Sequence, residues 1–318
     1  MAGPARFIIS LDCEGKWGMA DHLQPYHHEL LTDAALARAY EQLVALFGRY
    51  QVPATFAFVM AFVLTREERD RFEFELLGDE PDPWLQPYRE ALASGRAEGW
   101  HQPEALQIVR AAGGHEIACH SFCHRPLGDR SISAAGANAE LDAAMAAARL
   151  KGLSLDTFVY PRNEVGHLGE LRAHGFIGYR ERLRRPPGSL GRALSLAEEV
   201  NVWAPPQKAA PATDGMVAIP SGRFLNWRFG LRSWVPASTT VARWRHQLRS
   251  AADNGGVVHL WLHPHNLITG PGTESLLEAV VKEVAAMREA GRVRVLTQRD
   301  YCREMTDTAE VATVASAA

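Results

Sequence analysis

The sequence predicts an α/β fold, a distorted barrel of the (β/α)7 type with two loop insertions. Strand-like and helix-like segments alternate along the chain, the strands are nearly continuous apolar runs, and polar residues gather just after their C-terminal ends. Continuous apolar strands are typical of parallel sheets covered by helices. About seven such units favour a barrel over an open sheet, and in a barrel the C-terminal ends of the strands meet at the active-site face.

Strands are predicted from short runs of apolar, β-branched and aromatic residues. These runs are Phe7–Leu11, Ala54–Phe62, His115–Cys119, Thr157–Tyr160, Gly178–Arg182, Val257–Leu262 and Val293–Leu296. Helices are predicted where apolar residues recur every three or four positions, with Ser133 as an N-cap and Gly152 as a stop signal. The helices are Thr32–Tyr50, Glu104–Ala112, Ser133–Leu150, Leu168–His174, Thr239–Asn254, Thr273–Ala290 and a last short helix.

Two stretches break this alternation, and we predict them to be insertions in a single catalytic domain, 1–305. The first, 65–102, combines prolines and aromatic residues with many charges, which indicates a helix or two over one end of the fold. The second, 184–236, is irregular and rich in proline and glycine. The tail 306–318, rich in Ala, Thr and Val, is predicted to be flexible.

The composition limits the classes of function. With 47% hydrophobic and 22% charged residues in 318, the chain can bury a large core. A formal net charge of -3 disfavours a nucleic-acid partner or a polybasic membrane patch. No apolar run reaches the roughly 18 residues of a membrane span, so we expect no stable membrane insertion. The chain enters its first strand without a recognisable export signal, and its four cysteines form no disulfide-like framework, so we expect a cytoplasmic protein.

His120 and His124 lie four positions apart, directly after a predicted strand. On a helical turn, side chains at this spacing point the same way, so a divalent ion could accept one nitrogen from each. The spacing is also common in helices whose histidines are merely solvated, and by itself it leaves metal binding open.

Chemically active residues also follow three other predicted strands. These segments are Asp12-Cys13-Glu14, Tyr160-Pro161-Arg162-Asn163 and His263-Pro264-His265-Asn266. Because the strands of a parallel barrel all end at one face, we expect these residues to form one site with the histidine pair.

Together the motifs resemble the polysaccharide deacetylase family, the NodB-homology carbohydrate esterases of family 4, in the variant with an Asp-x-Glu first motif. The resemblance covers nearly the whole chain, and its most specific element is Gly114-His115-Glu116-Ile117 followed by His120-Ser121-Phe122-Cys123-His124. It implies a distorted (β/α) barrel that holds a divalent metal, usually zinc (Zn2+). It also implies removal of an N-acetyl or similar acyl group from a sugar amide.

By the same resemblance, His120 and His124 are metal ligands, Asp12 is the general base and His263 is the general acid. The family commonly has two adjacent aspartates in its first motif, and here Cys13 occupies the second position.

Family members with an Asp-x-Asp or Asp-x-Glu first motif use the acid one place later, so the resemblance implies Glu14 as the third ligand. Cys13 is the rival, since a thiolate is a good zinc ligand. Alternation along a strand favours Glu14, because Asp12 and Glu14 share a face from which Cys13 points away.

The third motif departs from the family pattern, in which an arginine precedes the proline and pairs with the base. Here the order is Pro161-Arg162. We expect Arg162 to reach Asp12 and hold it ionised; the alternative is an arginine that only ties two loops together.

Six further residues are candidate substrate contacts, the aromatic ones by stacking on a sugar ring. Packing at the barrel rim or support of a loop would use the same residues. The six are Trp17, Tyr160, Asn163, Trp261, His265 and Asn266. The pair His27-His28 is predicted to lie on the surface.

The expected substrate is an N-acylated sugar, sugar nucleotide or lipid-linked glycan, and the expected cofactor is zinc or another divalent metal. A cytoplasmic location favours O-antigen (lipopolysaccharide) or other surface-polysaccharide assembly. Two alternatives stay open. Cys13 and the order Pro161-Arg162 favour a metal-free or small-amide or cyclic-amide hydrolase on the same fold, and a non-catalytic carbohydrate-binding relative is the other.

Overall fold

The computed structural model describes residues 3–72, 82–182, 197–208 and 215–317. Within these residues one sheet of nine strands forms the centre of the molecule, and all strand pairs in it are parallel. The strands are β1 (Ala5–Cys13), β2 (Thr55–Phe58), β3 (Glu116–Cys119), β4 (Thr157–Phe158), β5 (Gly178–Arg180), β6 (Val217–Ile219), β7 (Arg223–Phe224), β8 (Val257–Leu262) and β9 (Val293–Leu296). Their order is β6-β5-β4-β3-β2-β1-β8-β7, and β9 also pairs with β1. The predicted α/β barrel with a parallel sheet is confirmed.

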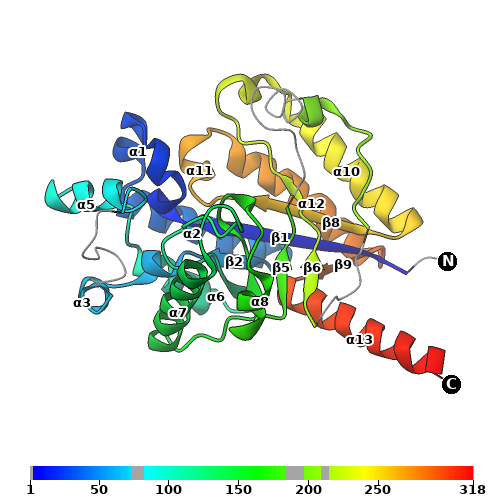
Figure 1. Cartoon of the computed structure of the whole chain (residues 1–318). Coiled ribbons are helices and arrows are strands. Elements are labelled where there is room, and N and C mark those ends of the chain that lie inside the picture. Colours follow the sequence, from blue (N-terminus) through cyan, green and yellow to red (C-terminus); the bar gives the residue numbers. More distant parts are fainter. Residues whose placement is uncertain (1–2, 73–81, 183–196, 209–214, 318) are drawn as a thin grey trace.

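Helices pack around this sheet (Figure 1). The longer ones are α2 (Asp33–Tyr50), α6 (Pro103–Ala112), α7 (Ala134–Leu150), α10 (Ala237–Asn254), α12 (Thr273–Glu289) and α13 (Gln298–Ala317). The shorter ones are η1 (Gly15–His22), α1 (Pro25–Leu30), η2 (Met60–Val63), α3 (Arg66–Asp70), α5 (Gln86–Ala93), η3 (Pro161–Asn163), α8 (Leu168–Ala173), η4 (Gly230–Trp234) and α11 (Asn266–Thr269).

Strand β1 occupies the centre of the sheet, where it pairs with β2, β8 and β9. Every residue of β1 except Arg6 is buried, as expected of an apolar strand covered on both faces. The residues that follow β1 therefore emerge in the middle of the barrel face, between the ends of β2 and β8.

Local sequence signals set several boundaries as predicted. Helix α2 begins after Thr32, whose Oγ1 accepts a hydrogen bond from the Ala35 amide at 3.2 Å, and α7 begins after Ser133, which accepts from Gly136 in the same way. Strands β8 and β9 have the predicted bounds.

Other boundaries differ from the prediction because long-range contacts set them. The predicted strand Ala54–Phe62 ends at Phe58, and the chain then turns into η2, where the Met60 and Ala61 amides donate to the Ser121 and Phe122 carbonyls.

The second predicted insertion, 184–236, contributes two strands of the central sheet, β6 and β7. These strands are three and two residues long. That is too short to show the alternation of apolar and polar residues by which a strand is recognised in a sequence rich in proline and glycine. Residues 73–81 of the first insertion, and 184–196 and 209–214 of the second, lie outside the described residues.

The last helix is longer than predicted. Helix α13 continues to Ala317, in keeping with the high helix propensity of alanine, and the flexibility expected of 306–318 stays a prediction. Among the described helices, none combines the length and apolarity needed to cross a bilayer.

The contact between β5 and α13 offers a test of the fold. A Cβ at Gly178 would collide with Sγ of Cys302 and come within 3.0 Å of the Val217 carbonyl oxygen. We expect Gly178→Ala to lower the free energy of unfolding by about 1–3 kcal/mol through overpacking, measured by denaturant unfolding.

The double variant Gly178→Ala/Cys302→Ala should recover part of the loss, because the colliding sulfur is gone. Gly169→Ala on α8 is the matched control, since a Cβ there meets open space. Unchanged stability of Gly178→Ala would contradict the close packing of α13 on β5.

Candidate active site

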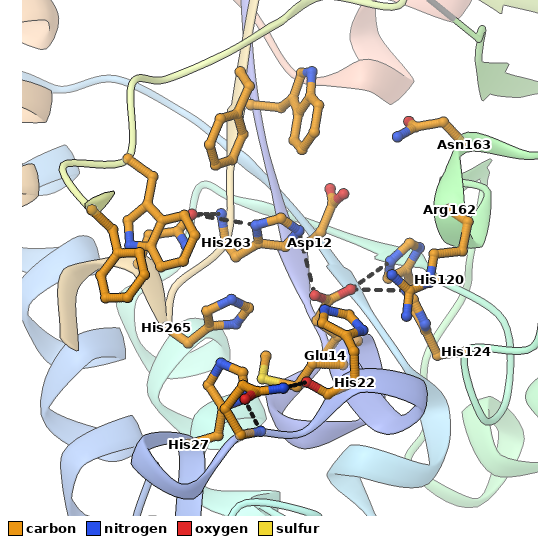
Figure 2. Close-up of a pocket in the computed structure, with 18 of the residues that line it drawn as sticks. Asp12, Glu14, His22, His27, His120, His124, Arg162, Asn163, His263 and His265 are labelled. Atoms are coloured by element: carbon orange, nitrogen blue, oxygen red, sulfur yellow. Dashed lines mark hydrogen bonds and ion pairs between the residues drawn. The ribbon is translucent and has the colours of Figure 1, made fainter. Parts of the chain in front are cut away.

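A cavity of about 500 Å³ opens at the C-terminal ends of the strands, around the residues that follow β1 (Figure 2). The described residues that line it are Asp12, Glu14, Gly18, Met19, His22, Gln24, Tyr26, His27, His120, His124, Arg162, Asn163, Phe224, Trp227, Phe229, Trp261, His263, His265 and Asn266. Asp12 and Glu14 are both buried and both reach this cavity, which agrees with their predicted common face.

Asp12 forms a buried, bidentate ion pair with Arg180 at the end of β5. The two guanidinium nitrogens Nη1 and Nη2 donate to Oδ1 and Oδ2 of Asp12, each at 2.7 Å. Burial by itself raises the pKa of Asp12, but the charge and hydrogen bonds of Arg180, together with the nearby His120 and His263, outweigh burial and hold that pKa below its ordinary value. Arg180 also lies 4.6 Å from the ring centroid of Trp261 and donates to Asn163, so three neighbours fix its position.

The expected pairing of Arg162 with Asp12 is wrong. Arg162 has a left-handed backbone (φ 57°) in η3, and its Nη2 donates to Asp21. The sequence contained a signal for Arg180, because Gly178–Arg182 is a predicted strand and its polar end belongs to the same barrel face. The expectation that polar residues at the ends of parallel strands share one site could therefore have been extended to Arg180.

Glu14 lies beside the two histidines that follow β3. Its Oε2 is 3.2 Å from Nε2 of His120 and 2.9 Å from Nε2 of His124. Nδ1 of His120 donates to the Val159 carbonyl at 2.7 Å, which leaves the Nε2 lone pair directed at Glu14.

The histidines reach this arrangement from a loop and not from the predicted helical turn. Ser121 and His124 have left-handed φ values of 64° and 60°, and these fold the loop back on itself. The ring centroids of His120 and His124 are 4.7 Å apart as a result.

These residues fit a divalent metal ion. The ligand atoms of Glu14, His120 and His124 lie within 4.8 Å of one another, and all three side chains are buried. One carboxylate oxygen and two imidazole nitrogens are a donor set that zinc accepts.

Cys13, the rival ligand, faces the other way. Its side chain belongs to the hydrophobic core, and Sγ lies 3.5 Å from the Leu11 carbonyl oxygen. Burial raises the pKa of this thiol well above its ordinary value, so it stays protonated and is a poor ligand.

His263 follows β8 and approaches Glu14 from the opposite side. Its Nε2 lies 3.3 Å from Oε1 of Glu14, and Oδ1 of Asn266 accepts from both its backbone amide and its Nδ1. His265 stacks on His263 with ring centroids 4.8 Å apart. Burial lowers the pKa of His265 to about 3, so this imidazole is neutral.

Aromatic side chains line one wall of the cavity, and most of them were not identified from sequence. Trp227 and Phe229 stack with centroids 4.6 Å apart, and Tyr26 lies against Phe229. Phe224 packs on Trp261, the one predicted member of this wall. The sequence signal that could have identified these residues is the cluster of aromatic residues near the end of the second insertion.

Two predicted substrate contacts have a packing role instead. Trp17 is fully buried against Tyr88 and Trp100, and Tyr160 is buried with its hydroxyl donating to the Gly166 carbonyl. The described residues that line the cavity include neither of them. Asn163, Trp261, His265 and Asn266 do line the cavity.

His27, predicted to lie on the surface, is buried and lines the cavity. Its Nδ1 accepts a hydrogen bond from the Gln24 amide at 3.0 Å in the capping box of α1. In the neutral ring the proton therefore sits on Nε2.

The position of Cys13 gives a direct test of the third ligand. We expect Glu14→Gln and His120→Ala to lose tightly bound zinc, because each removes a donor, whereas Cys13→Ser should keep it. Elemental analysis of dialysed protein measures the difference, with circular dichroism as the folding control. Equal zinc loss in a folded Cys13→Ser variant would show instead that the thiolate is a ligand.

Comparison with known proteins gives no match to the sequence among protein families or among curated proteins. Solved structures do match. A protein from Mycobacterium smegmatis, assigned as a polysaccharide deacetylase, superposes with a TM-score of 0.57 at 15% identity, over 97% of this chain and 92% of its own. A protein from Pseudomonas aeruginosa with the same assignment gives 0.53 at 14% identity, over 94% and 90%.

A third match is the PuuE allantoinase, with a TM-score of 0.55 at 12% identity over 94% of this chain and 89% of that one. At such identities the likeness concerns the fold. The chain therefore has the α/β barrel fold of the polysaccharide deacetylases, as the resemblance of its motifs implies.

Proposed function

We propose that the protein is a metal-dependent hydrolase that removes an N-acetyl or similar acyl group from a sugar amide. One observation carries the proposal. The buried group Glu14, His120 and His124 shares a cavity wall with the ion-paired Asp12, and His263 faces it from the next strand. Residues that would serve as the metal site, the base and the acid of an amide hydrolase therefore line one cavity.

Glu14, His120 and His124 would hold the metal. When bound, a divalent ion such as zinc polarises the amide carbonyl and lowers the pKa of a bound water toward roughly 7. Three protein ligands are the number that catalytic zinc sites use, which leaves room for water and substrate.

Asp12 acts as the general base that takes the proton of the attacking water. A buried carboxyl would ordinarily be protonated, but the ion pair with Arg180 keeps Asp12 ionised at neutral pH. Arg180 is thus a positioning residue that acts through Asp12.

His263 protonates the nitrogen of the departing amine, which is otherwise too basic to leave. The Asn266 amide oxygen accepts from Nδ1 of His263 and so directs Nε2 into the cavity. The water oxygen first forms the new C–O bond at the carbonyl carbon. The C–N bond then breaks as the carbonyl re-forms, and the products are a carboxylate, such as acetate, and a sugar amine.

The aromatic wall supports a sugar as the substrate. Rings such as Trp227 and Phe229, stacked with an interplanar angle of 7°, offer a flat apolar face to the C–H groups of a pyranose. We further propose an N-acylated sugar, free, nucleotide-linked or lipid-linked, used in O-antigen or other surface-polysaccharide biosynthesis in the cytoplasm. An assay over all three kinds of acceptor tests this finer assignment.

A second candidate function is the hydrolysis of a small or cyclic amide. The structural likeness to an allantoinase favours it. So does the fact that the arginine paired with Asp12 is Arg180 of β5 and not Arg162, which follows Pro161. Ring opening of a cyclic amide, without acetate release from any acetylated sugar, would select this alternative.

For the leading proposal, we expect zinc-loaded protein to release acetate from at least one N-acetylated sugar or sugar nucleotide. His120→Ala should lower this rate by about a hundredfold or more, because two remaining ligands hold the ion weakly. Coupled detection of acetate measures the rate. His246→Ala, which removes a histidine beside Trp203 outside the cavity lining, is the control. Full activity in His120→Ala would refute the proposed role.

The arginine assignment predicts a pH effect. Without Arg180, burial raises the pKa of Asp12 against the weaker opposing effect of His120 and His263, so the acid limb of kcat/KM in Arg180→Met should move to higher pH. We expect kcat at neutral pH to fall about tenfold to hundredfold, with partial rescue in Arg180→Lys. In Arg162→Met the acid limb should stay where it is. A shifted limb in Arg162→Met and an unshifted one in Arg180→Met would reverse the assignment.

A further inference from the structure

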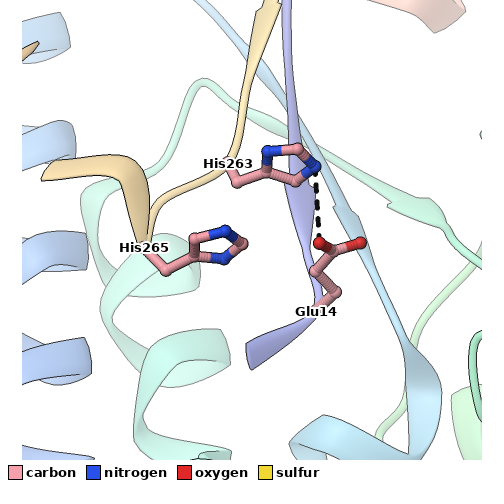
Figure 3. A group of neighbouring side chains, drawn as sticks. All are labelled: Glu14, His263 and His265. Carbon is pink, nitrogen blue, oxygen red and sulfur yellow. Dashed lines mark ion pairs between the residues drawn. The ribbon is translucent and has the colours of Figure 1, made fainter. Parts of the chain in front are cut away.

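A second group of metal-ligating side chains lies in the same cavity. The ligand atoms of Glu14, His263 and His265 lie within 4.8 Å of one another, as do those of Glu14, His120 and His124 (Figure 3). Glu14 belongs to both groups, with His120 and His124 on one side of it and His263 and His265 on the other (Figure 2).

The two carboxylate oxygens of Glu14 are divided between the groups. Oε2 faces His124 at 2.9 Å and His120 at 3.2 Å, whereas Oε1 faces His263 at 3.3 Å. A carboxylate whose oxygens are directed to different nitrogen sets is arranged to bridge two cations, which in two-metal sites lie about 3.5–4 Å apart.

We propose that the protein binds a second divalent cation between Glu14, His263 and His265, with Glu14 as the shared ligand. Two imidazoles and one carboxylate oxygen favour zinc, cobalt or nickel over magnesium or calcium, which prefer all-oxygen sites.

The histidines of this group are prepared for such a role. The Asn266 oxygen accepts from Nδ1 of His263, so the lone pair of the neutral ring lies on Nε2, the atom that faces Glu14. His265 is 8% exposed, lines the cavity, and its Nδ1 is buried without a hydrogen-bond partner among the described residues. A bound cation would satisfy this imidazole.

His27 does not belong to the second site, although it lines the same cavity. The Gln24 amide occupies its Nδ1, so its Nε2 carries the proton and has no lone pair to offer. His27→Gln is therefore a matched control, which removes a cavity histidine without removing a ligand.

The second cation is expected to bind more weakly than the first. Glu14 is the single carboxylate of both groups, and Asp12 is already neutralised by Arg180. Binding also engages the Nε2 of His263, and a nitrogen that holds a cation cannot carry a proton to the leaving amine. Occupation of this site therefore inhibits the hydrolysis proposed above, and on that point alone the inference rests on the proposed function.

Zinc binding to the full chain tests the site without a substrate. Calorimetric titration should show two zinc ions per wild-type chain, the second weaker, and one ion in His265→Ala. The control His27→Gln should keep both. Crystals of the wild-type protein soaked in zinc should show two anomalous peaks beside Glu14, a result that does not depend on whether His265→Ala folds. A single peak, or equal stoichiometry in wild type and folded His265→Ala, overturns the proposal.

Activity provides a separate readout. Excess zinc should inhibit acetate release by the wild-type enzyme, and His265→Ala should lose this inhibition relative to its own rate at low zinc. Inhibition that persists in His265→Ala would overturn the inhibitory role. Acetate release by a protein with one zinc peak would refute the second site and leave the hydrolase proposal standing, whereas two peaks without acetate release would do the reverse.

Discussion

The carboxylate of Glu14 lies between two pairs of histidines, and the arrangement of the cavity depends on its being held there. Glu14 follows the central strand β1, so it emerges between the loops after β3 and β8. Gly18 makes this position possible, because a Cβ at Gly18 would collide with the Glu14 carboxylate. A buried carboxylate is stable only with partners, and here the imidazoles of both pairs surround it.

The second buried acid, Asp12, is stabilised by a different partner. Its two oxygens both accept hydrogen bonds from Arg180, whose guanidinium also lies against the Trp261 ring and donates to Asn163. Asp12 and Glu14 are two residues apart, yet their partners differ. Asp12 is paired with the permanently charged Arg180, whereas Glu14 lies beside imidazoles that can bind a metal together with it. The end of β1 and the residue after it therefore supply a residue suited to base catalysis and a residue suited to metal binding.

Local sequence predicted much of the fold and part of the site. Capping by Ser133, and the bounds of β8 and β9, depend on residues next to one another in the chain. The expectation that Asp12 and Glu14 share a face from which Cys13 points away likewise rested on alternation along a strand. The predictions were wrong where distant contacts compete with local preference, as at the end of β2 and in the two short strands of the second insertion.

The sequence by itself determined that acids and histidines lie at the ends of parallel strands, because strand geometry fixes which side chains share a face. Tertiary structure alone decided which partner each one meets. Asp12 and Arg180 are 168 positions apart, and only the order of strands in the sheet brings them together in place of Arg162. Packing decided likewise that Trp17 points into the core and His27 into the cavity, since burial depends on neighbours that no local pattern specifies.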